Sequence, residues 1–170
     1  MNGTDDFEQI RILALSFREG IESAVVSGDI SPRTTRSTMP HFPRGCCDVT
    51  SDLLAQFLLE NSIHTKSIHG ECVYDHWESK FPHTWLETND GIIIDITADQ
   101  FAACDVFERF YLSPCYVGTD RSFYDLLSMI TERKNPWIKK CRWGFLQKKC
   151  GSSIRYYSQA HYLNSHDFFG

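Results

Sequence analysis

Three residue types that act together in thiol catalysis occur in order along this chain. Cys47 stands in "GCC" at the start of an amphipathic segment, His83 in "HTWLE" and Asp95 in "GIIIDIT". A nucleophilic cysteine needs a general base within hydrogen-bond reach, and the base needs a third group that orients it. The sequence therefore predicts Cys47 as the nucleophile, His83 as the general base and Asp95 as the orienting carboxylate.

The two adjacent cysteines are expected to differ in position. On a helical wheel of about 100° per residue, Cys46 falls in the middle of an apolar stripe. The stripe continues with Val49, Leu53 and Phe57. Cys47 lies on its flank, where a thiol can reach a cleft, and the positive end of the helix dipole favours its thiolate. Cys46 is therefore predicted to be a core residue.

Residues around Cys47 bear on the same chemistry. Gly45 allows close approach of a substrate to the backbone, and the amide of Cys47 in the first helical turn is a candidate oxyanion donor. Asp48 opposes ionisation of the neighbouring thiol. Gln100, in "TADQF", is a second candidate oxyanion donor, with capping of a turn as the alternative.

Strand geometry predicts how His83 and Asp95 meet. Period two places Trp85 on the same strand face as His83. If Asn89–Gly91 forms a three-residue loop with a left-handed glycine, Trp85 pairs with Asp95, and Asp95 becomes the diagonal neighbour of His83. A two-residue loop would put the two on opposite faces.

Asp95 also interrupts the apolar run "IIIDI". A buried carboxylate is costly unless it is paired. Two partners are expected to be possible here, the imidazole of His83 or backbone amides that would make Asp95 purely structural.

These motifs, in this order, resemble the papain-like thiol superfamily, and most of all its transglutaminase-like branch. The resemblance covers about residues 40–101. It implies a nucleophile helix packed on an antiparallel sheet, acyl transfer through a thioester, and the roles given above for Cys47, His83 and Asp95. Asp48 departs from the pattern, because an aromatic residue commonly follows the nucleophile. No glutamine precedes Cys47 where a papain-type oxyanion donor would stand.

The remaining pattern predicts a single α+β domain over residues 1–170, with additional helices around the core. Its parts are an N-terminal helix and loop (1–45), a catalytic core (46–101) and a helical, aromatic-rich part (102–170). The expected helices and strands are helices 5–26, 46–61, 121–133 and 137–150, and strands 64–74, 82–87 and 92–97. The long connection 27–45 and the aromatic tail are expected to select the acyl acceptor.

Composition limits the function classes. The net charge is −5 and no long basic stripe is present, which argues against nucleic acid as a partner. No run of apolar residues reaches membrane-spanning length. Acidic residues stand where a signal peptide would be basic, so we expect a cytoplasmic protein with reduced thiols, with secretion by another route left open.

Two alternatives to catalysis remain at this point. Zinc binding would draw on Cys46, Cys47, Cys72, His69 and His76, but structural zinc sites favour C-x-x-C spacing over adjacent cysteines. We therefore expect no metal and no cofactor. The other alternative is a non-catalytic binding module with this fold.

Within catalysis, the expected reaction is hydrolysis of an amide or peptide bond, as in a cysteine peptidase, amidase or deamidase. The expected partner is a protein or peptide substrate. Transglutaminase-type transfer to an amine uses the same triad and is the alternative. Hydrolysis is preferred because water needs no second binding site.

Overall fold

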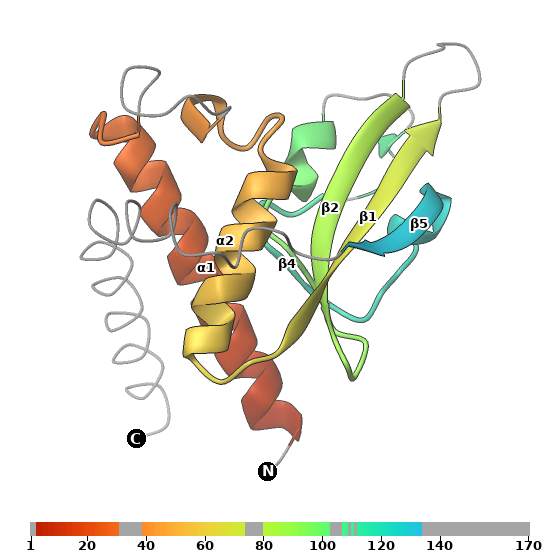
Figure 1. Cartoon of the computed structure of the whole chain (residues 1–170), viewed down its shortest axis with the longest axis horizontal. Helices are drawn as coiled ribbons and strands as arrows, with labels where there is room; N and C mark the ends of the chain where they lie inside the picture. Colours follow the sequence, from red (N-terminus) through yellow and green to blue (C-terminus); the bar gives the residue numbers. More distant parts are fainter. Residues whose placement is uncertain are drawn as a thin grey trace.

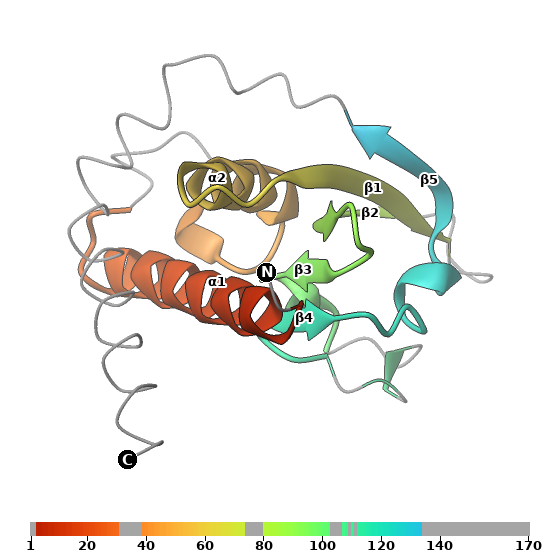
Figure 2. The ribbon, with the colours of Figure 1, turned by 90° about the horizontal axis from the view of Figure 1, so that it is seen from below.

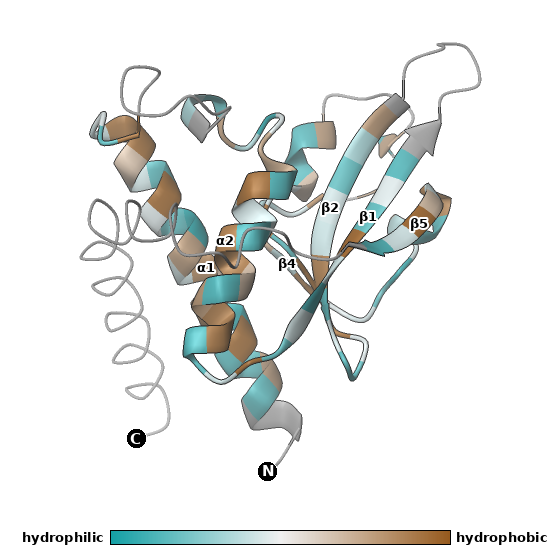
Figure 3. Ribbon diagram, viewed as in Figure 1, coloured by the Kyte–Doolittle hydropathy of each residue, from teal (hydrophilic) through white to brown (hydrophobic). Residues whose placement is uncertain are grey.

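The computed structural model describes residues 3–30, 39–73, 80–102, 107–108, 110 and 112–133. Helix α1 spans Gly3–Val26 and helix α2 spans Cys47–Glu60. Figures 1 and 2 show both helices side by side on one side of a curved sheet. Each helix carries hydrophobic and hydrophilic residues in alternation along its length (Figure 3), as amphipathic packing against a core requires. None of the described helices is long and apolar enough to cross a membrane.

The sheet has five strands in the order β4-β3-β2-β1-β5, and each neighbouring pair is antiparallel. The strands are β1 (Thr65–Val73), β2 (Lys80–Thr88), β3 (Ile93–Asp95), β4 (Tyr116–Gly118) and β5 (Ser128–Arg133). Short 3-10 helices span Met39–His41, Ala98–Phe101 and Tyr124–Leu126. The architecture is therefore α+β, as predicted.

The hairpin between β2 and β3 has the predicted register. Thr88 donates its amide hydrogen to the carbonyl of Ile92 at 2.9 Å, and Gly91 has a φ of 80°, in the left-handed region that glycine favours. Leu86 pairs with Ile94, so Trp85 lies opposite Asp95 one position further along. Asp95 therefore shares a sheet face with His83.

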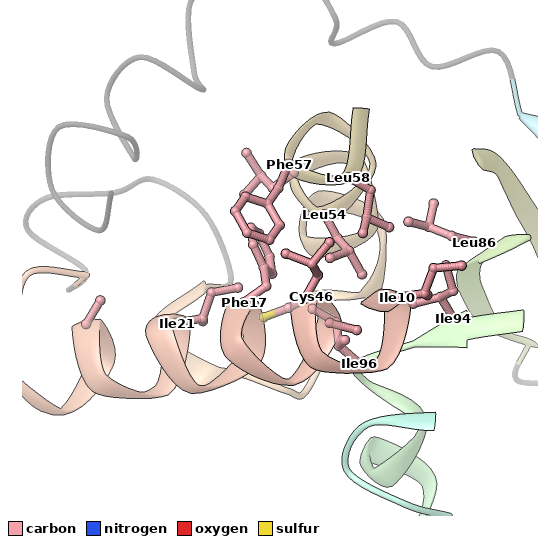
Figure 4. Packing of buried hydrophobic residues seen from close by; sticks show 14 of the residues in the cluster. Ile10, Phe17, Ile21, Cys46, Leu54, Phe57, Leu58, Leu86, Ile94 and Ile96 are labelled. Carbon is pink, nitrogen blue, oxygen red and sulfur yellow. The ribbon is translucent and has the colours of Figure 1, made fainter. Parts of the chain in front are cut away.

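The main hydrophobic core lies between the two helices and the sheet (Figure 4). Phe17 of α1 meets Phe57 of α2 with ring centroids 5.3 Å apart. Leu86 and Ile94 close this core from the sheet. Cys46 is 0% exposed and belongs to it, so the structure confirms that Cys46 is a core residue.

A second cluster covers the opposite face of the sheet. It is rich in aromatic residues and contains Ile68, Trp85, Ile93, Phe101, Phe107, Phe123, Tyr124 and Leu127. Alternate residues of β2 and β3 thus belong to two separate cores, because successive side chains of a strand point to opposite faces.

The helix predicted over residues 121–133 is wrong. Only a 3-10 turn forms at Tyr124–Leu126, and Ser128–Arg133 is strand β5, paired with β1. Met129 has a φ of 52°, which no α-helix contains. The edge of β1 supplies backbone partners to this segment, and tertiary pairing of this kind overrides a weak helical periodicity.

Other predicted elements agree within a few residues or cannot be compared. The third strand is shorter than predicted, because the chain leaves the sheet after Asp95. Residues 31–38 of the long connection, the predicted last helix 137–150 and the aromatic tail lie outside the described residues.

Candidate active site

The start of helix α2 places the two cysteines. Gly45 has a φ of 65°, a left-handed turn that brings the chain into the helix. Cys46 occupies the N-cap position, and its thiol donates to the carbonyl of Arg44 at 3.3 Å. Cys47 is the first helical residue and is 7% exposed. Its Sγ lies 3.9 Å from the carbonyl oxygen of Pro82, directly before His83. The structure thus brings Cys47 to the start of β2.

His83 and Asp95 form a buried pair on the aromatic face of the sheet. His83 Nε2 lies 2.6 Å from Asp95 Oδ2. The side chains are 0% and 1% exposed. Cys47 is near enough to His83 to favour the charged imidazole. The structure therefore brings the three residues that were predicted to act together to one place in the fold.

Asp95 is held by more than His83. Its Oδ1 accepts hydrogen bonds from the amide of Thr97 at 2.8 Å and from the Thr97 hydroxyl at 3.1 Å. The hydroxyl of Tyr124 donates to Oδ2 at 3.2 Å. Both partners expected from the sequence, the imidazole and a backbone amide, are thus present. Because both oxygens are engaged, the carboxylate is fixed in orientation.

Aromatic rings surround the imidazole. Trp85 stacks against His83 with centroids 5.8 Å apart, and Phe101 meets it edge-on at 5.0 Å. Phe123 adds a further edge contact at 6.2 Å. The indole N–H of Trp85 donates to Glu87 at 2.8 Å. Trp85 therefore packs beside the site, and its donor is already used.

The surroundings of the pair shift its proton equilibria. Burial disfavours a charge on His83, but Asp95 and then Cys47 favour it and raise the pKa of His83 to about 9. Burial likewise opposes the Asp95 carboxylate, yet His83 and Thr97 outweigh it and lower the pKa of Asp95. Burial and the neighbouring Asp95 raise the pKa of Tyr124 well above its ordinary value, so it remains a hydrogen-bond donor.

Gln100 connects the imidazole to the turn before the nucleophile. Its Nε2 lies 3.1 Å from His83 Nδ1. Its Oε1 accepts the amide hydrogen of Gly45 at 3.3 Å. Of the residues predicted around the triad, Gly45, Trp85 and Gln100 all lie next to it.

Asp48 turns away from the thiol that it follows. Its Oδ1 accepts a short hydrogen bond from the hydroxyl of Thr84 and lies 3.9 Å from Nδ1 of His69. The same Thr84 hydroxyl is 3.1 Å from His69 Nδ1. The carboxylate expected to oppose ionisation of Cys47 is thus engaged by β1 and β2.

Arg18 of α1 fixes the segment that carries Asp95 and Gln100. Its guanidinium pairs with Asp99 through two hydrogen bonds of 2.9 and 2.8 Å. It also donates to the carbonyls of Ile96, at 2.6 Å, and of Pro114. Arg18 is 7% exposed. A single buried arginine therefore ties the chain after β3 to the helical layer.

Sequence reasoning missed three of these contributors. The contact of Thr97 could have been expected, because an Asp side chain commonly accepts a hydrogen bond from the backbone amide two residues further along the chain. Arg18 lies in a helix, and the sequence around it does not indicate its distant partners. Tyr124 fell in the segment predicted to be a helix, so its contact with Asp95 was not expected.

The described residues contain no group of three or more His, Cys, Asp or Glu side chains that could hold a metal ion. The side chain of Cys72 and all of His76, two members of the imagined zinc set, lie outside that part of the chain. Cys46, Cys47 and Cys115 are free thiols.

Comparison of the chain with protein-family models, with curated proteins and with solved structures found no match.

Proposed function

We propose that this chain is a thiol-dependent acyl-transfer enzyme that hydrolyses an amide or peptide bond. The observation that carries the proposal is the position of Cys47, which begins α2 with its Sγ 3.9 Å from the carbonyl next to His83. The buried His83 in turn has its Nε2 2.6 Å from Asp95. A base held between a thiol and a fixed carboxylate is the arrangement that thiol acyl transfer needs.

The steps follow from these positions. His83 takes the proton of Cys47, and the thiolate sulfur attacks the carbonyl carbon of the substrate. His83 then gives its proton to the leaving amine, and an acyl thioester forms on Cys47. Water, deprotonated by His83, attacks the thioester and releases the acid and the thiol. Asp95 stabilises the imidazolium and keeps one tautomer of the ring.

The start of α2 supplies the electrostatics of this mechanism. The first amides of a helix have no acceptor within the helix, and the helix dipole favours negative charge at this end. The backbone N–H of Cys47 is therefore our candidate donor to the oxyanion.

The fold supports the papain-like and transglutaminase-like relationship as part of the proposal. Helix α2 packs on β2 and β1, and the order of helix, strand with His83 and strand with Asp95 matches what the resemblance implies. We further propose a protein or peptide substrate, and a reducing compartment such as the cytoplasm, in keeping with the free thiols of Cys46, Cys47 and Cys115.

A trapping experiment tests the proposal. The full chain is mixed with p-nitrophenyl acetate, an activated acyl donor, and the acyl adduct is located by mass spectrometry. We expect an adduct on Cys47 that hydroxylamine removes. It should be absent from Cys47→Ala and nearly absent from His83→Ala. An adduct rate unchanged in His83→Ala would overturn the proposal.

Product analysis then separates hydrolysis from amine transfer. Peptides with side-chain and terminal amides are incubated with the chain, with and without a primary amine such as dansylcadaverine. Release of acid and ammonia or amine at the same rate in both arms supports hydrolysis. Preferential incorporation of dansylcadaverine would replace it with transglutaminase-type transfer.

A further inference from the structure

The amide of Gln100 lies between two groups with fixed hydrogen-bonding roles. The backbone nitrogen of Gly45 can only donate, so the Gln100 atom 3.3 Å away must be Oε1. The NH2 group of Gln100 therefore faces His83 Nδ1 at 3.1 Å. An amide NH2 donates and does not accept, so Nδ1 must be unprotonated when this contact forms.

Asp95 and Gln100 thus pull on the imidazole in opposite directions. Asp95 at Nε2 favours the charged ring. Gln100 at Nδ1 fits the neutral ring alone, because the imidazolium carries a hydrogen on both nitrogens. When His83 takes the proton of Cys47, the Gln100 NH2 and the new Nδ1–H become two donors that face each other.

The backbone of Gln100 cannot move to separate these two donors, because it is held in place. Its amide nitrogen donates to the Thr97 carbonyl at 3.1 Å. The preceding Asp99 is clamped by Arg18. The side chain is only half-buried and Gly45 is exposed, so rotation of the amide is the available response, with water taking over the Gly45 N–H.

We propose that Gln100 is a proton-coupled amide switch, whose NH2 group faces Nδ1 when His83 is neutral and which turns over when Nδ1 takes the Cys47 proton. After rotation, Oε1 accepts from Nδ1–H and stabilises the imidazolium. The NH2 group then faces Gly45 and the start of α2, where it donates to the carbonyl oxygen of the substrate together with the Cys47 amide. The proton moves from Sγ to Nδ1, and no other bond changes. The inference rests on the proposed function.

The switch predicts a split between thiol reactivity and acyl transfer in Gln100→Ala. Rotation gives up the hydrogen bond from the Gly45 amide, so without substrate Gln100 favours the neutral ring on balance. Its loss should therefore move the midpoint of the pH profile of Cys47 alkylation to lower pH by about one unit. Loss of an oxyanion donor should slow acyl transfer by about a hundredfold. Alkylation with iodoacetamide needs no substrate, so the two readouts are independent.

Gln100→Glu provides a second variant of nearly the same shape. Its carboxylate accepts from both Nδ1–H and the Gly45 amide, but donates to neither the ring nor a substrate. We expect the alkylation midpoint to fall and acyl transfer to be lost. Gln56→Ala, which removes the same side chain from α2 far along the helix from Cys47, is the control and should match the wild type in both readouts.

The outcomes separate this inference from the proposed function. If wild-type Cys47 is alkylated no faster than in His83→Ala, the proposed function fails. If wild-type reactivity depends on His83 but Gln100→Ala keeps the wild-type midpoint, the switch alone is overturned. If Gln100→Ala lowers the midpoint but leaves acyl transfer unchanged, the switch is also overturned, because Gln100 would then supply no hydrogen-bond donor to the oxyanion.

Discussion

The two faces of strands β2 and β3 differ in chemistry, because alternate residues of the same strands point to opposite sides of the sheet. Leu86 and Ile94 point into an apolar core shared with α1 and α2. His83 and Asp95 point to the other face, where they form a buried polar pair among aromatic rings. The first face depends on shape and volume, and the second on whether each polar atom has a partner.

This difference explains why several groups form hydrogen bonds with the one carboxylate of Asp95. An apolar side chain such as Ile94 is stabilised by any neighbour of suitable shape. Asp95 is destabilising in the same strand unless both of its oxygens are satisfied. His83, Thr97 and Tyr124 supply those bonds. The helical face thus sets the position of the strands, and the aromatic face holds the orientation of the reactive groups.

The largest expected effect is the loss of activity that distinguishes Cys47, next to the polar pair, from Cys46, in the apolar core. Cys47→Ala should lower acyl transfer to background, by about 10⁵-fold or more, because the nucleophile is lost. Cys46→Ala should leave the reaction intact and lower the free energy of unfolding by about 1–2 kcal/mol, because it removes a small buried group from the core. Rate assays and urea unfolding of both variants measure this. Loss of activity in Cys46→Ala at wild-type stability would contradict the division.

The next effect compares the two faces of β3 directly. Asp95→Asn should lower the rate by about 10³- to 10⁴-fold, because the imidazole loses its charged partner and its preferred tautomer. Ile94→Ala should instead lower the free energy of unfolding by about 2–5 kcal/mol.

The comparison is made on folded protein, checked by circular dichroism at the assay temperature. Full activity in Asp95→Asn would remove Asp95 from the mechanism. A rate defect in folded Ile94→Ala as large as that of Asp95→Asn would show that the faces are not separable in function.

Arg18 joins the two regions, so its loss should affect both. Arg18→Met should lower the free energy of unfolding by about 3 kcal/mol, because Asp99 loses its buried partner. Arg11→Met is the matched control on the same helix. Its pair with Glu8 is about half exposed on both sides, so that variant should change stability by less than about 1 kcal/mol. Equal effects in chemical denaturation would contradict the role given to Arg18.

A further expected effect is a pH dependence of stability. Because the pKa of His83 is raised from 6.5 to about 9 in the folded chain, its contribution is fully present below about pH 6.5 and is lost as the pH rises through about 9. The lowered pKa of Asp95 works in the other sense: its contribution is present above its ordinary pKa and is lost on acidification.

Urea unfolding across this range tests the pH dependence. The wild type should lose stability between about pH 6.5 and 9, and Asp95→Asn should show a much flatter profile there. The same slope in both proteins would mean that the pair does not set it.

Much of the arrangement could be predicted from local pattern. The helical wheel identified Cys46 as a core residue, and Gly91 gave the hairpin register that puts Asp95 on the face of His83. These features depend on periods and turn types that a short segment fixes by itself.

Long-range contacts were beyond such reasoning. Tyr124 reaches Asp95 only because the segment after it pairs with β1 instead of forming a helix. Arg18 of α1 pairs with Asp99, which lies 81 residues further along the chain. Nothing in the neighbourhood of either residue specifies its partner, since both contacts form only when the sheet and helices have packed.

Selective alkylation of the folded chain tests the central claim most directly. Iodoacetamide is added near neutral pH, and fragment mass spectrometry distinguishes the adjacent Cys46 and Cys47. Cys115 is an internal reference, because burial raises the pKa of its thiol to about 12. We predict that Cys47 is modified first and that His83→Ala removes this preference. Modification of Cys46 or Cys115 before Cys47, or a preference that survives in His83→Ala, would contradict the account.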